Sequence, residues 1–320
     1  MTSLYGNALA KQAFSAALEG GSLHHAWLLA GPEGIGKASF AMLAVRRILA
    51  GAGQPDDYAI PPGDRTQQLI DAGSHPDFKK LERLPKDEKK PEQGLARSIT
   101  VAQVRAIEPF FSVKPTFSER RVVLIDSADD LERNGANALL KNLEEPPAGT
   151  VFLLVSHAPG RLLPTIRSRC RLLRFEPLDD ADMRAALTHA GAKASEIDEL
   201  VRVGQGSPAQ ALAMAGLDIA GLDNALTQLA KGDPSNAVRS ELASKLSLKA
   251  AQPRYEAFLD RAPRFIAAQA RARSGEALRA ALDAHDAARN LAASALGLSL
   301  DAQGTVFEMG GIVASLAERR

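Results

Sequence analysis

The sequence predicts an α/β domain built on a parallel sheet, followed by an all-helical region. Two observations carry this prediction. In the first half of the chain, short apolar runs alternate with amphipathic helical patterns, which is typical of parallel strands connected by helices. After Pro177 the strand-like runs disappear, and Ala, Leu and Arg recur at helical spacing to the end of the sequence. We therefore expect a sheet domain over residues 1–176 and helical domains after it.

Size, charge and cysteine content limit the class of protein. The 320 residues suffice for two or three domains, and the formal net charge is only +1, so any DNA contact must be local or shared with partners. The single cysteine, Cys170, excludes an internal disulfide and a cysteine-rich zinc site and fits a reducing compartment. No apolar stretch approaches the roughly 20 residues of a membrane span. We expect a cytoplasmic protein without membrane contact.

Four apolar runs are the strand candidates: residues 25–31, 121–127, 151–157 and 171–175. The first runs into the glycine-rich sequence GPEGIGK, and an amphipathic helix follows from Lys37. A strand, a glycine loop and a helix in this order are the context of a phosphate-binding loop. The candidate nucleotide-binding residues of the loop are Gly31, Gly34, Gly36 and Lys37.

The loop departs from the pattern G-x-x-x-x-G-K-[ST] at its last position. Ala38 stands where a hydroxyl would hold Mg²⁺. Ser39 follows one residue late, and because one residue turns a helical side chain by about 100°, its hydroxyl points away from the metal position. We expect a degenerate nucleotide site that holds no metal and needs no cofactor, and at which ATP binding is doubtful.

Asp126 ends the second apolar run. In phosphate-loop proteins an acid at this position holds Mg²⁺, usually through water, so Asp126 joins the candidate nucleotide site. The alternative is a strand-end aspartate that caps the next helix. Motor ATPases usually place a glutamate directly after this acid to polarise the attacking water, and here the residue is Ser127.

Helical patterns and a solvated segment fill the rest of the first half. Residues 51–98 are rich in Gly, Pro and charge, and we expect a solvated loop in their charge run. TVAQ, residues 100–103, is a capping box that starts a helix ending near Pro115. Residues 134–147 predict another helix, which a proline pair ends. One face of that helix carries Ala136, Leu139, Leu140 and Leu143.

The helical second half divides at Gly216. Residues 204–216 predict a turn that caps a short helix. Beyond it, breaks are expected at 232–235, 252–253 and 297–300. We expect a small helical domain over residues 177–216 and a helical bundle over residues 217–320.

Three stretches, LHHAWLLAGPEGIGK, NALLKNLEEPP and LLPTIRSRCRLLRF, occur in an order and spacing that resemble the clamp-loader subunits of bacterial DNA polymerase III. SHPDF (74–78) and SHAPGRLLPTIRSRC (156–170) are similar to the delta prime branch of that family rather than to its gamma/tau motors. The resemblance covers roughly residues 1–216. The C-terminal helices match only in helical character and length.

The resemblance implies a RecA-like AAA+ domain, a small helical lid and a helical collar through which five subunits form an open ring. That ring opens the sliding clamp and places it on primed DNA. The implied partners are the gamma/tau motor and delta subunits, with the clamp contacted indirectly and primed DNA contacted within the complex. Delta prime subunits are stators, which contribute little or no hydrolysis.

The family's Ser-Arg-Cys motif corresponds to Ser168, Arg169 and Cys170. The resemblance implies that Arg169 acts in trans, as an arginine finger that reaches the ATP of the adjacent motor subunit. A permanent planar cation suits the charge that develops on a transferring phosphoryl group. The alternative is a surface or fold-stabilising arginine. Cys170 is expected to be a buried small residue rather than a reactive thiol.

Two departures from the family pattern stand out. Many members carry four zinc-binding cysteines in the segment that here runs from Gly51 to Ala72, which contains none, so we expect no zinc. In the lid, motor subunits show G-S-x-R, and Ala209 takes the place of that arginine. With Ala38 and Ser127, three elements of an ATPase are missing. The loop is retained either for packing or for weak phosphate binding.

Three other functions are compatible with parts of the sequence. A gamma/tau-like motor could tolerate Ala38 if phosphates and water hold Mg²⁺. An unrelated phosphate-loop enzyme would need its own acceptor site, and no catalytic cluster is evident in the helical half. A purely structural oligomerisation protein would explain the helices but not the motif around Arg169. ATP turnover of the isolated chain separates an enzyme from a stator.

Overall fold

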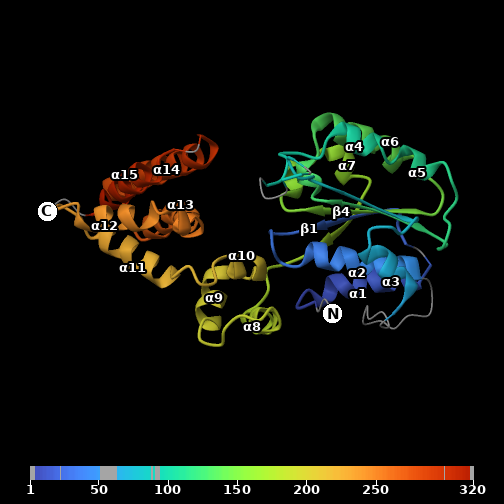
Figure 1. Cartoon of the computed structure of the whole chain (residues 1–320), viewed down its shortest axis with the longest axis horizontal. Helices are drawn as coiled ribbons and strands as arrows, with labels where there is room; N and C mark the ends of the chain where they lie inside the picture. The colour runs from blue at the N-terminus through green and yellow to red at the C-terminus, as the bar shows by residue number, and fades with distance from the viewer. Residues whose placement is uncertain are drawn as a thin grey trace. The chain divides into compact units, whose positions relative to one another are not determined.

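The computed structural model describes residues 4–21, 23–50, 63–87, 89–90, 94–298 and 300–317. Contacts divide the chain into two compact units, Met1–Leu212 and Ala213–Arg320. The first unit contains the sheet and the first helices after it, and the second is helical (Figure 1). Within the described ranges, no helix is both long enough and apolar enough to cross a membrane.

The first unit is built on a five-stranded parallel sheet, in the order β2-β3-β4-β1-β5. The strands are β1 (Ala26–Ala30), β2 (Phe78–Glu82), β3 (Arg121–Asp126), β4 (Thr150–Ser156) and β5 (Arg171–Arg174). The predicted α/β class and the four expected strands are confirmed. No apolar pattern in the sequence predicts β2, an edge strand whose side chains are mostly exposed or half-buried.

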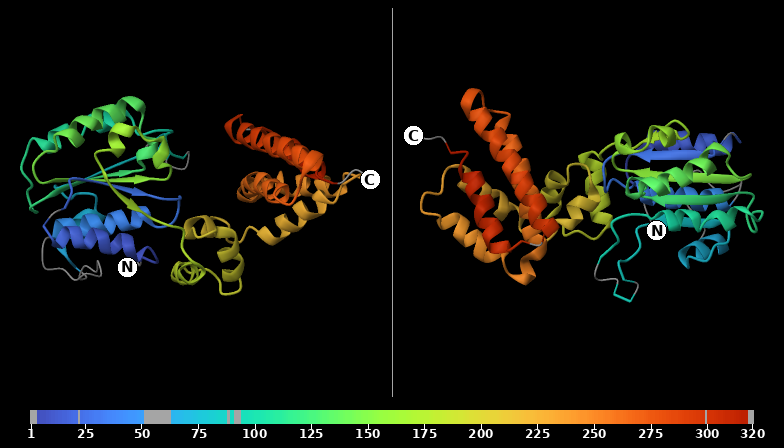
Figure 2. Two further views of the ribbon diagram at one scale, coloured as in Figure 1. Left: turned by 180° about the vertical axis from the view of Figure 1, so that it is seen from behind. Right: turned by 90° about the horizontal axis from the view of Figure 1, so that it is seen from above.

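Helices cover both faces of the sheet (Figures 1 and 2). One face carries α1 (Ala8–Glu19), α2 (Lys37–Ala50) and α3 (Arg65–Asp71). The other carries α4 (Val101–Arg105), α5 (Glu108–Phe111), α6 (Arg133–Glu144) and α7 (Pro164–Arg167). Alternate strand residues supply the two cores: Trp27 and Leu29 face one layer, and Leu28 faces the other. This alternation explains why the runs are apolar throughout, because both faces are buried.

The capping box at Thr100 is present, with the Gln103 backbone N–H bonded to the threonine hydroxyl and the glutamine side chain bonded to the Thr100 N–H. The single helix expected from this point to Pro115 is wrong, since two short helices, α4 and α5, form instead. Pro109 lies in the first turn of α5, where its missing N–H is tolerated, and could not continue α4. The predicted helix at 134–147 is confirmed as α6.

Three helices follow the sheet: α8 (Asp180–His189), α9 (Ile197–Gly204) and α10 (Pro208–Ala213). The Leu178 N–H donates to the Gly206 carbonyl at 2.9 Å, which ties the turn before α10 to the chain leaving β5. The contact division falls between residues 212 and 213, so these helices group with the sheet. A separate lid over residues 177–216 stays a prediction.

The second unit contains α11 (Ile219–Ala230), α12 (Ala237–Leu246), α13 (Gln252–Ala270), α14 (Gly275–Leu298) and α15 (Ala302–Ala314). The expected break at 232–235 is confirmed. Of the break expected at 297–300, the first two residues still belong to α14, and residue 299 lies outside the described residues. The break expected at 252–253 is wrong, because Gln252 begins α13 and Pro253 lies in its first turn. The chain is interrupted just before it, around the short 3₁₀ turn Lys249–Ala251.

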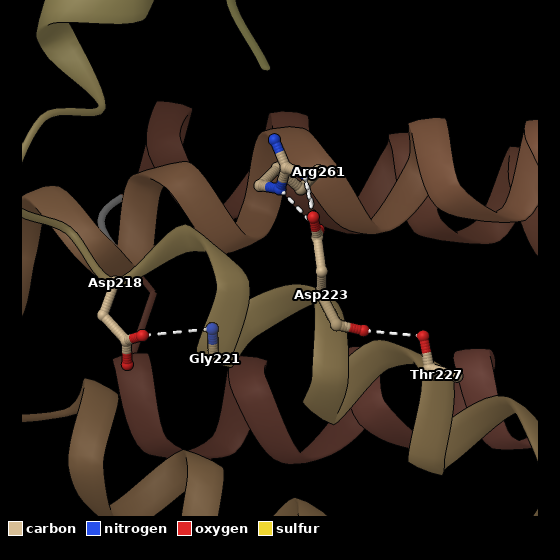
Figure 3. A network of polar contacts seen from close by, with 5 residues as sticks. All are labelled: Asp218, Gly221, Asp223, Thr227 and Arg261. Atoms are coloured by element: carbon tan, nitrogen blue, oxygen red, sulfur yellow. Dashed lines mark hydrogen bonds and ion pairs between the residues drawn. The ribbon is translucent and has the colours of Figure 1, made fainter. Parts of the chain in front are cut away.

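An ion pair joins the first and third helices of this unit, as Figure 3 shows. The Arg261 guanidinium on α13 contacts both carboxylate oxygens of Asp223 on α11, with Nη2–O distances of 2.5 and 2.7 Å. At the start of α11 the Asp218 carboxylate accepts the Gly221 N–H at 3.1 Å, which caps the helix. The ion pair links α11 to α13, and the cap stabilises the start of α11; the buried residues of this unit are mostly Ala and Leu.

Candidate functional site

Lys37 turns its ammonium back onto its own loop. Its Nζ donates to the Gly31 carbonyl at 2.7 Å and to the carbonyl of Pro32, and the residue is only 2% exposed. Burial lowers the pKa of Lys37 to about 8, although the carboxylates of Asp129, Glu33 and Asp126 act in the opposite direction. The cation that would contact phosphate is therefore satisfied by backbone oxygens.

The helices after the sheet contact the loop directly. The Ser207 hydroxyl donates to the Glu33 carbonyl at 2.9 Å, and the Ala209 N–H donates to the Gly34 carbonyl at 3.2 Å. Gly34 has φ +78°, and a Cβ there would lie 2.4 Å from the Ser207 Oγ. Glycine is thus required at this position by both conformation and space. Ala209, at the family's arginine position, contributes only its backbone.

The magnesium side of the loop is incomplete. Ala38 has no hydroxyl, and the carboxylate of Asp126 at the end of β3 lies 3.7 Å from the Lys80 ammonium. The following 3₁₀ turn, Ala128–Asp130, is capped by the Ser127 hydroxyl, which accepts the Asp129 N–H at 3.2 Å. Ser127, and not Asp126, therefore caps this turn. This set of side chains does not fit a magnesium–nucleotide complex of the motor type.

Arg169 follows α7 and is one-third exposed, at 33% of its side chain. Its Nη1 donates to the Thr165 carbonyl at 2.9 Å, and its Nη2 lies 2.6 Å from the Glu144 carboxylate at the end of α6. These partners are separate from the loop cluster formed by Lys37. Next to it, Cys170 is half-buried rather than fully buried as expected, and its partial burial raises the pKa of the thiol to about 12.

A cavity of about 840 Å³ borders both parts of the site. It opens at the carboxyl ends of β1, β4 and β5, the edge at which ligands of parallel α/β sheets bind. Gly31 of the loop and Ser168 of the Ser-Arg-Cys motif both line it. The fold therefore brings the two sequence motifs, separated by more than 130 residues, to one edge of the sheet.

Asp129 is a residue of this edge that no sequence motif indicates. Its carboxylate accepts four hydrogen bonds, from the Ser127 and Ser156 hydroxyls and from the His157 and Ala158 N–H groups. Although burial acts in the opposite direction, these hydrogen bonds hold the pKa of Asp129 below its ordinary value. An acid shortly after a strand is visible in sequence, but its partners at the end of β4 are not.

No cluster of three or more potential metal ligands occurs among the residues with described positions. Part of the segment in which the family pattern would place zinc-binding cysteines, residues 51–62, lies outside the described residues. The absence of zinc stays a prediction.

Comparisons with known proteins identify the family. The model of the family described as "DNA polymerase III, delta subunit" matches residues 6–179, more than half of the chain. The DNA polymerase III subunit delta' of Pseudomonas aeruginosa is 39% identical over 213 residues. The chain belongs to the delta prime family of clamp-loader subunits. The match to gamma/tau subunits, at 30% identity, reflects a related family.

The delta prime relatives match over part of their length. The alignment to the Pseudomonas aeruginosa subunit covers 64% of this chain and 60% of the relative, and the Bacillus subtilis delta' is 36% identical over 50% of this chain and 45% of its own length. A solved gamma subunit-related protein from Thermotoga maritima aligns with 95% of this chain and 98% of its own, at 17% identity and a TM-score of 0.48. The match to the two delta prime relatives therefore spans about half to three-fifths of their length.

Proposed function

We propose that this delta prime family member is the stator of a clamp loader: it helps to load a sliding clamp on primed DNA, does not hydrolyse ATP, and supplies Arg169 to the ATP of a neighbouring motor subunit. The observation that carries the proposal is the contrast between the two motifs. Lys37 is buried on its own loop carbonyls, whereas Arg169 is one-third exposed beyond the end of a short helix.

Arg169 suits action in trans for physical reasons. Its guanidinium is held by a carbonyl and a carboxylate near the surface, and it keeps N–H donors for a phosphate. A permanent cation placed at a transferring phosphoryl group stabilises the charge that develops there. Lysine, a flexible point charge, would reproduce this geometry poorly.

The loop suits a site that does not hydrolyse nucleotide. To contact a phosphate, Lys37 would have to leave two backbone carbonyls. Ala38 offers no hydroxyl to Mg²⁺, Ser127 is engaged as a turn cap, and Ala209 has no charge. We infer that the loop serves as packing between β1, α2 and the turn before α10, and that no cofactor is required.

The proposed partners are gamma/tau motor subunits and a delta subunit, with the sliding clamp reached through the complex. The net charge of +1 supports DNA contact only within the assembled ring, where basic groups of several subunits combine. The helical second unit is the proposed collar that holds the ring.

Reconstitution tests this function. Motor subunits, a delta subunit and the clamp from the same organism are assayed for loading on primed DNA, with and without this chain. Loading should require the chain, and a Lys37→Met chain that folds normally should support it as well as wild type. Full loading without the chain refutes the stator role, and loss of loading with Lys37→Met points to a motor instead.

A further inference from the structure

The carboxylate of Asp129 joins the ends of two strands. Its Oδ2 accepts the His157 N–H at 2.6 Å and the Ser127 hydroxyl at 2.8 Å. Its Oδ1 accepts the Ala158 N–H at 3.1 Å and the Ser156 hydroxyl at 2.9 Å. Each oxygen thus takes one backbone N–H and one hydroxyl, and charge-assisted bonds of this kind are stronger than neutral ones.

His157 and Ala158 begin the segment that leads to Arg169. The Ala158 carbonyl accepts the Arg161 N–H at 2.8 Å, which starts the turn after β4. Further along, Ile166 is buried in the core and its carbonyl accepts the Arg169 N–H at 3.1 Å. A series of turns thus connects Arg169 to the two residues whose N–H groups Asp129 binds.

We propose that Asp129 is a positioning residue for Arg169: by binding the His157 and Ala158 N–H groups it fixes the start of the segment that carries the finger. The inference rests on the proposed function of Arg169. It assigns to Asp129 a role in the hydrolysis at the neighbouring subunit, although its carboxylate does not touch that ATP.

The location of Asp129 explains how this positioning works without nucleotide. Burial lowers the pKa of Lys37, and the negative charge of Asp129 acts in the opposite direction. All four donors to the Asp129 carboxylate belong to this chain, so the end of β4 is held without a nucleotide. Adding ATP to the isolated chain should leave hydrogen exchange of residues 157–170 unchanged.

Asp129→Asn is the sharpest variant. The amide has one acceptor oxygen and one NH₂ group, so in either orientation its NH₂ faces one of the two backbone N–H groups. The serine hydroxyls can rotate to accept instead, but a backbone N–H cannot. The matched control is Asp130→Asn, which removes the adjacent carboxylate. That carboxylate lies 3.1 Å from the Arg83 Nε, whereas the His157 and Ala158 N–H groups donate to Asp129.

The experiment uses assembled rings containing wild-type, Asp129→Asn, Asp130→Asn, Arg169→Ala or Asp129→Asn/Arg169→Ala chain. We expect Asp129→Asn to lower the Arg169-dependent part of kcat for DNA-stimulated ATP hydrolysis at least twofold, with the KM for ATP unchanged. Asp130→Asn should match wild type. In the Arg169→Ala background, Asp129→Asn should cause no further loss, because both changes act through the same guanidinium.

Each other outcome contradicts the positioning role of Asp129, the proposed function of Arg169, or both. If Arg169→Ala lowers turnover but Asp129→Asn does not, the positioning role is refuted and the proposed function stands. An additional loss in the double variant shows that Asp129 acts by another route. If Asp129→Asn chains fail to fold or assemble, the carboxylate serves the fold as a whole. If Arg169→Ala itself has no effect, the proposed function and this inference both fail.

Discussion

The guanidinium of Arg169 and the carboxylate of Glu144 form an ion pair between the segment after α7 and the end of α6, with Nη2 and Oε1 2.6 Å apart. The two side chains are 33% and 49% exposed, so water screens their attraction. The pair orients the guanidinium, but it is weak enough for a phosphate of another subunit to compete for the same N–H donors.

The pair should contribute little to stability. We expect a double-mutant cycle of Glu144→Gln and Arg169→Ala, measured by urea unfolding of the isolated chain, to give a coupling free energy of about 0.2–1 kcal/mol. A coupling well above 2 kcal/mol would mean that Arg169 is a structural arginine.

The isolated chain should not hydrolyse ATP. With Lys37 bonded to loop carbonyls and alanine at position 38, phosphate release should be no faster than in buffer, with or without primed DNA. Lys37→Met is the control for contaminating enzymes, because it alters only this loop. A steady turnover that Lys37→Met abolishes contradicts the stator account.

Gly34→Ala should destabilise the first unit. The added Cβ would meet the Ser207 Oγ at 2.4 Å and the Ala209 Cβ at 2.9 Å, in a backbone conformation with positive φ. We expect a loss of about 1–3 kcal/mol in the free energy of unfolding. Gly160→Ala is the matched control, since nothing lies within 4 Å of its added Cβ. Equal stability of both variants contradicts the contact between the loop and the turn before α10.

Cys170 should resist alkylation in the folded state. With its pKa raised to about 12, roughly one thiol in 10,000 is ionised at pH 8. Iodoacetamide should therefore modify the native chain far more slowly than the urea-unfolded chain. Because this pKa is raised from 9.0 to about 12 on folding, the free energy of unfolding should fall as pH rises from about 9 towards about 12. The Cys170→Ala variant should not show this fall. Equal alkylation rates in both states would show an accessible thiolate.

Much of the first unit can be predicted from sequence because its central strands are apolar on both faces and follow distinct loop and helix patterns. β2 lacks such an apolar pattern because it is an edge strand that carries Lys79, Lys80 and Glu82. In the sequence these charges resemble a solvated loop. Pro109, by contrast, was a visible signal that the helix from Thr100 ends early.

The candidate site was predictable only in its motifs. The glycine loop and the Ser-Arg-Cys motif are local sequence patterns, but the hydrogen bonds and ion pairs that position their side chains are not visible in the sequence. Lys37 bonds within its own loop, Asp129 reaches residues 27–29 positions away, and Arg169 pairs with Glu144 across two helices. Such pairings depend on the register of β3 and β4 and on helix packing, which no single pattern encodes.

The central claim, that Arg169 acts on the ATP of a neighbour, is tested most directly by DNA-stimulated ATP hydrolysis of rings containing wild-type, Arg169→Ala, Arg169→Lys or Arg161→Ala chain, with assembly checked by size exclusion. Arginine fingers supplied in trans are worth roughly 10³–10⁵ in rate at their own site, while other sites of the ring keep their own. We therefore predict that Arg169→Ala and Arg169→Lys lower total turnover by the share of one site, and that the exposed control Arg161→Ala does not. Fully assembled Arg169→Ala rings that hydrolyse ATP at the wild-type rate would contradict the account.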